Sequence, residues 1–317
     1  MSGLLDKKTF LRGGRRGKTS SSLNESRDLR SMFLQNYKQF PSTILKHDKR
    51  ESDLYAIGSG RGYEDTGCTK RRGKKVGPEF EMSGKGRMPG PGTKSDALSG
   101  FSQNIGRMIT DFYCPDKGIV YDPFAGHNSR MSLVFSGGRT YIGCDVSKEF
   151  MKFNKIICEK LLKRVGFFAP KDNTIILKEI SSHDVDLPDN YADFTITSPP
   201  YWDIEYYGDE PEQLGKCETY QLFIERITLH IQENLRILKP GAYCCWFIND
   251  FVKDNVFYPY HSDLISVFSK VGFEVFAIYI VDLGSTIACC FLQPVFKRMR
   301  FAKRHEYCLV FRKQKGE

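Results

Sequence analysis

A rigid turn that ends in two aromatic residues lies near the middle of the chain, where Ser198-Pro199-Pro200-Tyr201-Trp202 directly follows an apolar stretch. Two consecutive prolines fix two φ angles and remove two backbone donors, so the turn is rigid and offers carbonyl acceptors. This combination suits a planar amine: the Ser198 hydroxyl and the Pro199 carbonyl can accept its two N–H bonds, while Tyr201 stacks on the ring. The alternative is a proline-rich strand exit with a tyrosine in the core, which the other motifs disfavour.

A second turn of small and polar residues, Asp122-Pro123-Phe124-Ala125-Gly126-His127-Asn128-Ser129-Arg130, lies between a predicted strand and a helical run. Small residues at such a place let a ligand approach the backbone and the helix N-terminus closely, which is a cofactor-binding geometry. The dinucleotide fingerprint requires three glycines at fixed spacing, and here Gly126 stands alone. Taken by itself, the motif fits a plain strand-to-helix turn equally well.

An acidic residue, Asp145, follows the predicted strand 140–144 at about the twenty-residue distance expected in nucleotide-binding units. Its side chain could accept hydrogen bonds from both hydroxyls of a ribose, which favours an adenosine-containing cofactor. Asp145 also precedes Ser147-Lys148-Glu149, so a helix cap is the alternative. The pairing of Asp145 with the turn at 122–130 supports the cofactor hypothesis.

The elements that must position these residues begin at about Phe101, where short β-branched or aromatic runs alternate with amphipathic stretches. This alternation predicts an α/β fold with a parallel sheet and crossover helices. The seven predicted strands are 118–121, 140–144, 174–177, 193–197, 242–247, 273–281 and 306–311. The predicted helices are 149–165, 219–238 and 261–271, with a further short helix at 23–37 in the N-terminal region.

These motifs resemble the DNA amino-methyltransferase family, whose members modify cytosine N4 or adenine N6, and the resemblance covers residues 99–317. The family's catalytic tetrapeptide, Ser/Asp/Asn-Pro-Pro-Tyr, matches Ser198, Pro199, Pro200 and Tyr201 in full. The resemblance implies S-adenosylmethionine as the cofactor. It also implies a doubly wound, mostly parallel seven-stranded sheet, which is the S-adenosylmethionine-dependent methyltransferase fold. The catalytic domain would span 99–317, preceded by a basic N-terminal region at 1–98.

The cofactor turn departs from the family at one position. The family sequence is Asp-Pro-Phe-x-Gly-Ser-Gly, and Asn128 stands where it has its second glycine. A phenylalanine usually found within Phe-x-Pro corresponds to Phe101, although Gln103 replaces the proline. The resemblance implies seven cofactor-binding residues: Phe101, Asp122, Phe124, Ala125, Gly126, Asn128 and Asp145.

The activity that follows is methyl transfer to an exocyclic amino nitrogen of a base in DNA. The strands that carry Asp122 and Ser198 are neighbours in the family's sheet, so their carboxyl ends open into one crevice. The target base must be turned out of the duplex, and Tyr201 with Trp202 would hold it by stacking. Serine at the first catalytic position favours cytosine N4 as the target. Adenine N6 is the alternative target. Because the second glycine is lost, a DNA-binding protein on a decayed methylase fold is a further alternative.

The charge is unevenly distributed: residues 1–100 carry 21 Lys and Arg against 11 Asp and Glu, and the remaining residues carry 26 against 27. A basic arm beside a neutral core indicates a nucleic-acid partner, because Lys and Arg contact phosphates. We expect five residues of a Gly-rich segment to follow the DNA backbone: Lys70, Arg71, Arg72, Lys74 and Lys75. A solvated, flexible tail is the alternative.

The ten cysteines include no Cys-x-x-Cys pair, and several lie in apolar runs, which predicts reduced thiols and no metal site. No apolar stretch approaches the roughly 18 residues of a membrane span, and the N-terminus does not resemble a signal peptide. We therefore expect a cytoplasmic protein that associates with the nucleoid through DNA. The sequence leaves open the DNA recognition site, a cognate restriction endonuclease and the oligomeric state.

Overall fold

The structure is a computed structural model that describes residues 101–126, 130–165, 173–204, 207–284 and 292–315, with residues 31, 34–37, 39 and 42–46. The chain divides into two units, Met1–Ser42 and Thr43–Glu317, and the described residues lie mostly in the second. The predicted DNA-contacting residues at 70–75 and the predicted cofactor residue Asn128 lie outside the described residues.

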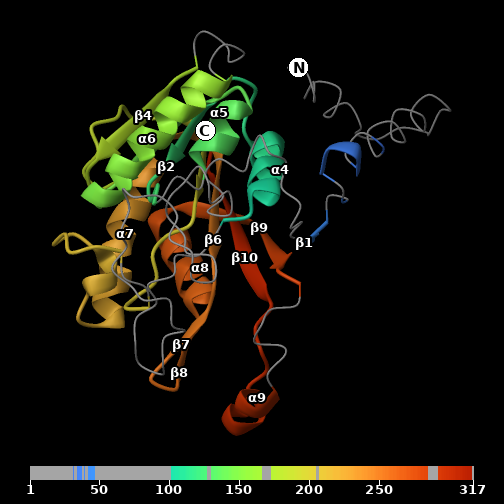
Figure 1. Cartoon of the computed structure of the whole chain (residues 1–317). Helices are drawn as coiled ribbons and strands as arrows, with labels where there is room; N and C mark the ends of the chain where they lie inside the picture. The colour runs from blue at the N-terminus through green and yellow to red at the C-terminus, as the bar shows by residue number, and fades with distance from the viewer. Residues whose placement is uncertain are drawn as a thin grey trace. The chain divides into compact units, whose positions relative to one another are not determined.

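An eight-stranded sheet forms the core of the second unit, in the order β1-β9-β10-β6-β5-β2-β3-β4 (Figure 1). β10 runs antiparallel to its neighbours β6 and β9, and the other pairs are parallel. The strands of this sheet are β1 (Ile44–Lys46), β2 (Ile119–Asp122), β3 (Thr140–Asp145), β4 (Ile175–Glu179), β5 (Ala192–Thr197), β6 (Leu238–Ile248), β9 (Phe273–Asp282) and β10 (His305–Lys313). A separate antiparallel hairpin follows β6 and consists of β7 (Phe251–Lys253) and β8 (Val256–Tyr258).

Helices cover both faces of the sheet. The α-helices are α4 (Gln103–Tyr113), α5 (Met131–Ser136), α6 (Lys148–Val165), α7 (Tyr220–Ile237), α8 (Tyr260–Val271) and α9 (Leu292–Arg298), with a short 3-10 helix at Leu214–Lys216. Trp246 of β6 packs against Phe268 of α8, and its neighbour Phe247 packs against Phe101 at the start of α4, with ring centroids 5.0 and 4.8 Å apart. Because successive strand residues point to opposite faces, β6 is covered on both sides.

The predicted doubly wound, mostly parallel sheet is confirmed. All seven predicted strands and the three helices predicted beyond residue 100 occur at their places, with bounds shifted by a few residues, whereas most of the helix predicted at 23–37 lies outside the described residues. The strand count needs correction from seven to eight, because β1 pairs with the end of β9 through Ile44 and Ile280. Three residues of the predicted N-terminal region thus belong to the sheet, and Leu45 among them is buried.

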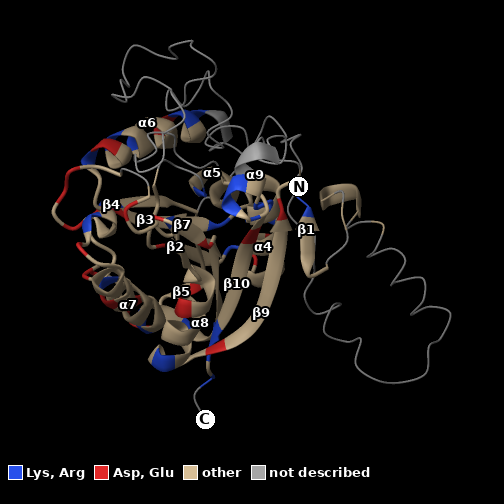
Figure 2. Cartoon of the chain, turned by 90° about the horizontal axis from the view of Figure 1, so that it is seen from below, with Lys and Arg blue, Asp and Glu red and all other residues tan. Residues whose placement is uncertain are grey.

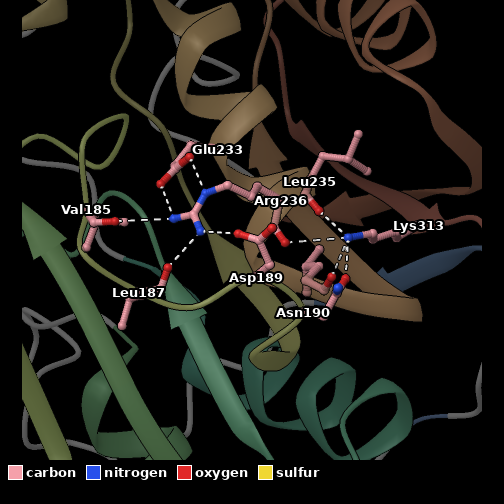
Figure 3. Close-up of polar contacts among 9 residues, drawn as sticks. Val185, Leu187, Asp189, Asn190, Glu233, Leu235, Arg236 and Lys313 are labelled. Atoms are coloured by element: carbon pink, nitrogen blue, oxygen red, sulfur yellow. Dashed lines mark hydrogen bonds and ion pairs between the residues drawn. The ribbon is translucent and has the colours of Figure 1, made fainter.

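Two cations tie the C-terminal end of α7 to the neighbouring loop and strands (Figure 3). Arg236 donates to the carbonyls of Val185 and Leu187 and forms ion pairs with Asp189 and Glu233. The Lys313 ammonium of β10 donates to the carbonyls of Leu235 and Leu238, at 2.7 and 2.8 Å, and to Asn190. The last carbonyls of α7, which have no partner within the helix, are thereby satisfied.

The described helices include none that is long and apolar enough to cross a membrane. The seven described cysteines are free thiols, six of them buried. Among the residues that the structure describes, no three His, Cys, Asp or Glu side chains are grouped so that they could hold a metal ion.

Candidate active site

Asp122, at the end of β2, is completely buried and makes four hydrogen bonds. Its Oδ2 accepts from Arg130 Nε at 2.6 Å and from the Tyr141 hydroxyl at 2.8 Å. Its Oδ1 accepts from the Thr197 hydroxyl at 2.7 Å and from the Phe124 amide at 3.3 Å. These partners come from β3, from β5 and from both sides of the predicted cofactor turn, so the carboxylate fixes the path of that turn.

Asp145, at the end of β3, holds the other side of the same turn. Its Oδ2 accepts from the Gly126 amide and its Oδ1 from the Ser147 amide, both at 2.8 Å. The Asn154 side chain of α6 donates to the Gly126 carbonyl at 2.8 Å, and the Ala125 amide donates to a carbonyl of β3. Burial raises the pKa of Asp145 to about 6, although the two backbone hydrogen bonds act to lower it.

Space lies beside the backbone of Gly126. This residue has a φ of +56°, a left-handed conformation that glycine adopts without strain. A Cβ built there would have only the Phe124 carbonyl oxygen within 4 Å among the described residues, at 3.9 Å. The turn therefore combines a fixed backbone with room at its surface, and residues 127–129, which continue it, lie outside the described part of the chain.

The predicted catalytic turn continues from β5, the strand next to β2. Val120 and Tyr121 of β2 pair in parallel with Phe194 and Thr195 of β5, so both strands end at the same side of the sheet. Thr197, whose hydroxyl reaches Asp122, is followed directly by Ser198. The two predicted motifs are thus connected by one hydrogen bond at the carboxyl ends of neighbouring strands.

Tyr201 is held from two sides. Phe251 of β7 and Tyr260 of α8 contact its ring edge-on, with centroids 6.1 and 6.0 Å away. The Tyr260 hydroxyl also donates to the Pro200 carbonyl at 3.3 Å, and the Tyr201 amide donates to the Tyr207 hydroxyl at 3.3 Å. Ser198 is half-buried and Pro199 is buried, so the four residues of the tetrapeptide form a supported turn rather than a loose loop.

Trp202 lies in a different environment from the one predicted. Its indole is 8% exposed, and its N–H donates to the Cys217 carbonyl at 2.8 Å. The Tyr258 and Tyr220 rings pack against it, and the Lys253 ammonium lies 4.2 Å from the ring centroid. This packing favours a role in supporting the turn over the predicted contact with a base.

Phe101 joins the site through its packing. Besides contacting Phe247, its ring lies below the guanidinium of Arg130, 5.3 Å from the ring centroid. Arg130 also donates to the Phe124 carbonyl and pairs with Asp122. The structure therefore brings Phe101, Phe124 and Asp122 together around Arg130, a residue to which the sequence motif gave no role.

A polar group at the carboxyl end of β6 was also missed. Asp250 accepts from the His261 ring at 2.7 Å, and its carbonyl accepts from Lys303. His261 stacks on Tyr307 of β10 with centroids 4.2 Å apart. Burial raises the pKa of Glu306, at the start of β10, to about 7, against the opposing effect of nearby Lys303. Lys303 and Tyr307 lie at or just before the start of β10, whereas their partners Asp250 and His261 are far away in the sequence.

The sheet order, its one antiparallel strand and the turn after β2 define the S-adenosylmethionine-dependent methyltransferase fold. Residues 192–317, from β5 onward, match a family model described as DNA methylase, of the N6 and N4 type. The resemblance to the DNA amino-methyltransferases is thereby confirmed for the part of the chain that contains Ser198 to Tyr201. No curated protein matches the chain.

Solved structures with related folds include a SAM-dependent methyltransferase from Methanosarcina mazei. It is 13% identical, with a TM-score of 0.44, and the match covers 66% of this chain and 98% of that one. A protein from Thermus thermophilus, provisionally described as a DNA modification methylase and crystallised with S-adenosyl-L-methionine, is 25% identical with a TM-score of 0.32. That match covers 42% of this chain and 52% of the Thermus protein, about half its length.

Proposed function

We propose that this chain is an S-adenosylmethionine-dependent DNA methyltransferase that modifies an exocyclic amino nitrogen, with cytosine N4 as its target. The hydrogen bond between Thr197 and Asp122, 2.7 Å long, is the observation that carries the proposal. It fixes the catalytic turn next to the cofactor turn, as transfer between two bound molecules requires. The match of residues 192–317 to a DNA methylase family supports DNA as the substrate.

The residues of the first turn suit S-adenosylmethionine. A carboxylate has about four lone-pair sites, so Asp145 can accept from ribose hydroxyls while it keeps its bonds to Gly126 and Ser147. The space beside Gly126 would take the methionine part of the cofactor next to the Phe124 carbonyl, with the buried Ala125 supporting the turn from behind. Asp122 acts indirectly, because its hydrogen bonds hold the turn. Phe101, packed under Arg130, and Asn128 complete the proposed set.

The bound cofactor supplies an electrophilic methyl group on a sulfonium. The amine of a base is a poor nucleophile, since its lone pair is delocalised into the ring. Acceptance of its two N–H bonds by Ser198 Oγ and the Pro199 carbonyl would make the nitrogen more tetrahedral and direct the lone pair at the methyl carbon. Tyr201, fixed by Phe251 and Tyr260, would stack on the base after it leaves the duplex.

Transfer of a labelled methyl group from S-adenosylmethionine to DNA by the purified chain tests the reaction. Activity of the wild type and its loss in Ser198→Ala, with cofactor binding retained, is the expected result. Cofactor-independent DNA binding with no transfer would indicate the decayed-fold alternative instead.

The choice of cytosine N4 rests on Ser198. A neutral hydroxyl is a weaker acceptor than the carboxylate that many adenine-N6 enzymes of this family carry at the same place. Nucleoside mass spectrometry of DNA modified by the chain should show N4-methylcytosine. A product pool that contains N6-methyladenine and no N4-methylcytosine would contradict the assignment.

The basic run Lys70, Arg71, Arg72, Lys74 and Lys75 is proposed to contact the DNA backbone. Because β1 at 44–46 belongs to the sheet, the test should replace the five residues by glutamine rather than delete residues 1–98. We expect weaker DNA binding and a shallower salt dependence, by roughly one unit of slope per lost contact. An unchanged salt dependence would indicate a solvated tail.

A further inference from the structure

A short basic arm extends from the sheet between β9 and β10. It consists of residues 295–304, Val-Phe-Lys-Arg-Met-Arg-Phe-Ala-Lys-Arg, and begins within α9. Half of its residues are Lys or Arg and none is acidic, although the chain beyond residue 100 is close to neutral. Figure 1 shows α9 at the same end of the sheet as β7 and β8, and in Figure 2 the Lys and Arg positions of α9 are coloured blue on its ribbon.

Large apolar side chains alternate with these charges. Phe296, Met299 and Phe301 are 69%, 88% and 93% exposed, the three most exposed large apolar residues of the described chain. Exposed apolar groups of this size usually mark an interaction surface. Aromatic rings interleaved with Lys and Arg are typical of surfaces that hold phosphates and contact bases.

The backbone of the arm has a defined turn. Met299 has a φ of +47°, and its amide donates to the Phe296 carbonyl at 3.3 Å, while the Arg300 amide donates to the Val295 carbonyl at 3.2 Å. These bonds form the helix C-terminal motif in which glycine is usual. A methionine there costs roughly 1–2 kcal/mol in left-handed backbone strain. Met299 thus occupies a position at which folding alone would favour glycine.

Two of the five cations fasten the arm beside the proposed active site. Lys303 donates to the Asp250 carbonyl, just beyond the end of β6, and Arg304 pairs with Asp282 at 3.0 Å. The other three, Lys297, Arg298 and Arg300, are exposed. Since β6 lies next to β5, which leads into Ser198, the base of the arm is two strands from the catalytic turn.

We propose that residues 295–304 form a DNA-binding arm that contacts the duplex next to the target base. The inference rests on the proposed function and adds a second DNA contact, separate from residues 70–75. Lys297, Arg298 and Arg300 bind backbone phosphates, and Met299 and Phe301 contact the bases beside the turned-out nucleotide. DNA fits better than a membrane, because α9 has only seven residues and the apolar and basic residues interleave along 296–301, mostly beyond the helix.

The first test removes the exposed charges in Lys297→Gln/Arg298→Gln/Arg300→Gln and measures binding to a mixed-sequence duplex over a range of salt concentrations. We expect the slope of log affinity against log salt to fall by about three units, roughly one for each phosphate contact. The matched control, Lys152→Gln/Lys155→Gln/Lys163→Gln, removes the same charge from exposed positions of α6. Equal effects of the two variants would overturn the proposal.

Met299→Gly separates binding from folding. Glycine relieves the left-handed strain at this position, so the variant should unfold at a higher denaturant concentration than the wild type. We nevertheless expect weaker binding to the same mixed-sequence duplex than the wild type shows. DNA binding equal to that of the wild type would exclude a DNA contact by Met299.

The outcomes distinguish the arm from the proposed activity. Absence of methyl transfer by the wild type would contradict the proposed function, whereas the salt slopes would still report on the arm. Full methyl transfer with unchanged DNA binding in the triple variant would contradict the arm alone. A third outcome is that the wild type binds phosphatidylserine vesicles, that the triple substitution abolishes this binding, and that DNA binding is unchanged. The partner of the arm would then be a membrane surface instead of DNA.

Discussion

The two ends of the central sheet use their polar side chains differently. At the end where β10 finishes, Arg236 and Lys313 are saturated by carbonyls and acidic groups of the chain itself (Figure 3). At the opposite end, Asp122 is saturated in the same way, but Asp145 keeps acceptor capacity and Ser198 stays half-buried. At the first end, the described contacts of Arg236 and Lys313 hold elements together, whereas the second end also presents groups that a ligand could use.

This difference separates stability from activity. Substitutions where β10 finishes should lower the free energy of unfolding and leave chemistry intact. A substitution at Ser198 should impair methyl transfer and change the free energy of unfolding little. Substitutions at Gly126 and Asp145 should impair cofactor binding and also affect stability, because both residues fix the backbone of the turn. Asp122 lies between the two classes, because its removal would leave Arg130 buried without its partner carboxylate.

The largest effect is expected for Ser198→Ala. Loss of the hydroxyl removes one of two acceptors for the amine, which should lower kcat by about two to three orders of magnitude, as removal of a single preorganised polar group does elsewhere. Single-turnover methyl transfer measures this, and calorimetry should give an unchanged affinity for S-adenosylmethionine. A variant with normal turnover would remove Ser198 from the catalytic group.

Gly126→Val should abolish measurable cofactor binding, with a loss in affinity of at least about 100-fold, or about 2.7 kcal/mol. A branched side chain would fill the space beside the turn, and it strains a φ of +56°. Isothermal titration calorimetry is the measurement. Gly126→Ala serves as the control, because it introduces the backbone strain with much less volume; near-normal binding by a folded Gly126→Val would place the cofactor elsewhere.

The strands could be predicted because their apolar runs are buried by the sheet itself, as in β5, where four consecutive residues, Phe194 to Thr197, are buried. β1 could not be predicted, because its three residues form a strand only by pairing with the edge of β9.

The helix α4 was also missed. It contains Gly106 and β-branched residues, which lower helix propensity, and a Cβ at Gly106 would come within 2.4 Å of Phe101. Packing, rather than propensity, determines this helix.

The neighbouring positions of the two motifs followed from the strand order that the family resemblance implied. The partners of individual side chains could not be predicted in this way. Arg130 reaches Asp122 only because the turn between them folds back, and Trp202 is buried by Tyr220 and Tyr258, which follow it by many residues. Contacts of this kind depend on tertiary structure that no local pattern encodes.

Lys313→Met tests the other end of the sheet. The variant keeps the aliphatic stem but removes the charge that satisfies the last carbonyls of α7, so the free energy of unfolding should fall by about 1–2 kcal/mol. Urea denaturation measures the change. Lys152→Met, at an exposed position of α6, is the control and should change stability by less than about 0.5 kcal/mol. A large loss of kcat in folded Lys313→Met would contradict the separation of the two ends.

The smallest effect, and the most specific one, concerns the ionisation of Asp145. Burial raises its pKa to about 6, so the carboxylate becomes protonated as the pH falls through that value. Protonation removes acceptor sites that the ribose hydroxyls require, and we expect affinity for S-adenosylmethionine to decrease severalfold between pH 7 and pH 5, the range around a pKa of about 6.

The contribution of Asp145 to the stability of the free protein should change with pH in the opposite direction. A carboxyl whose pKa is raised on folding stabilises the fold in acid, and this contribution is lost as the pH rises through about 6.

Asp145→Asn separates these effects from those of other carboxylates. The variant should bind the cofactor weakly at every pH, with a flat profile, and the difference in unfolding free energy between it and the wild type should change across the same range. Calorimetry and urea denaturation at matched pH values measure both quantities. If the wild-type affinity is independent of pH while the stability difference still changes, Asp145 serves only to hold the backbone at Gly126 and Ser147, and the ribose contact must be assigned to another residue.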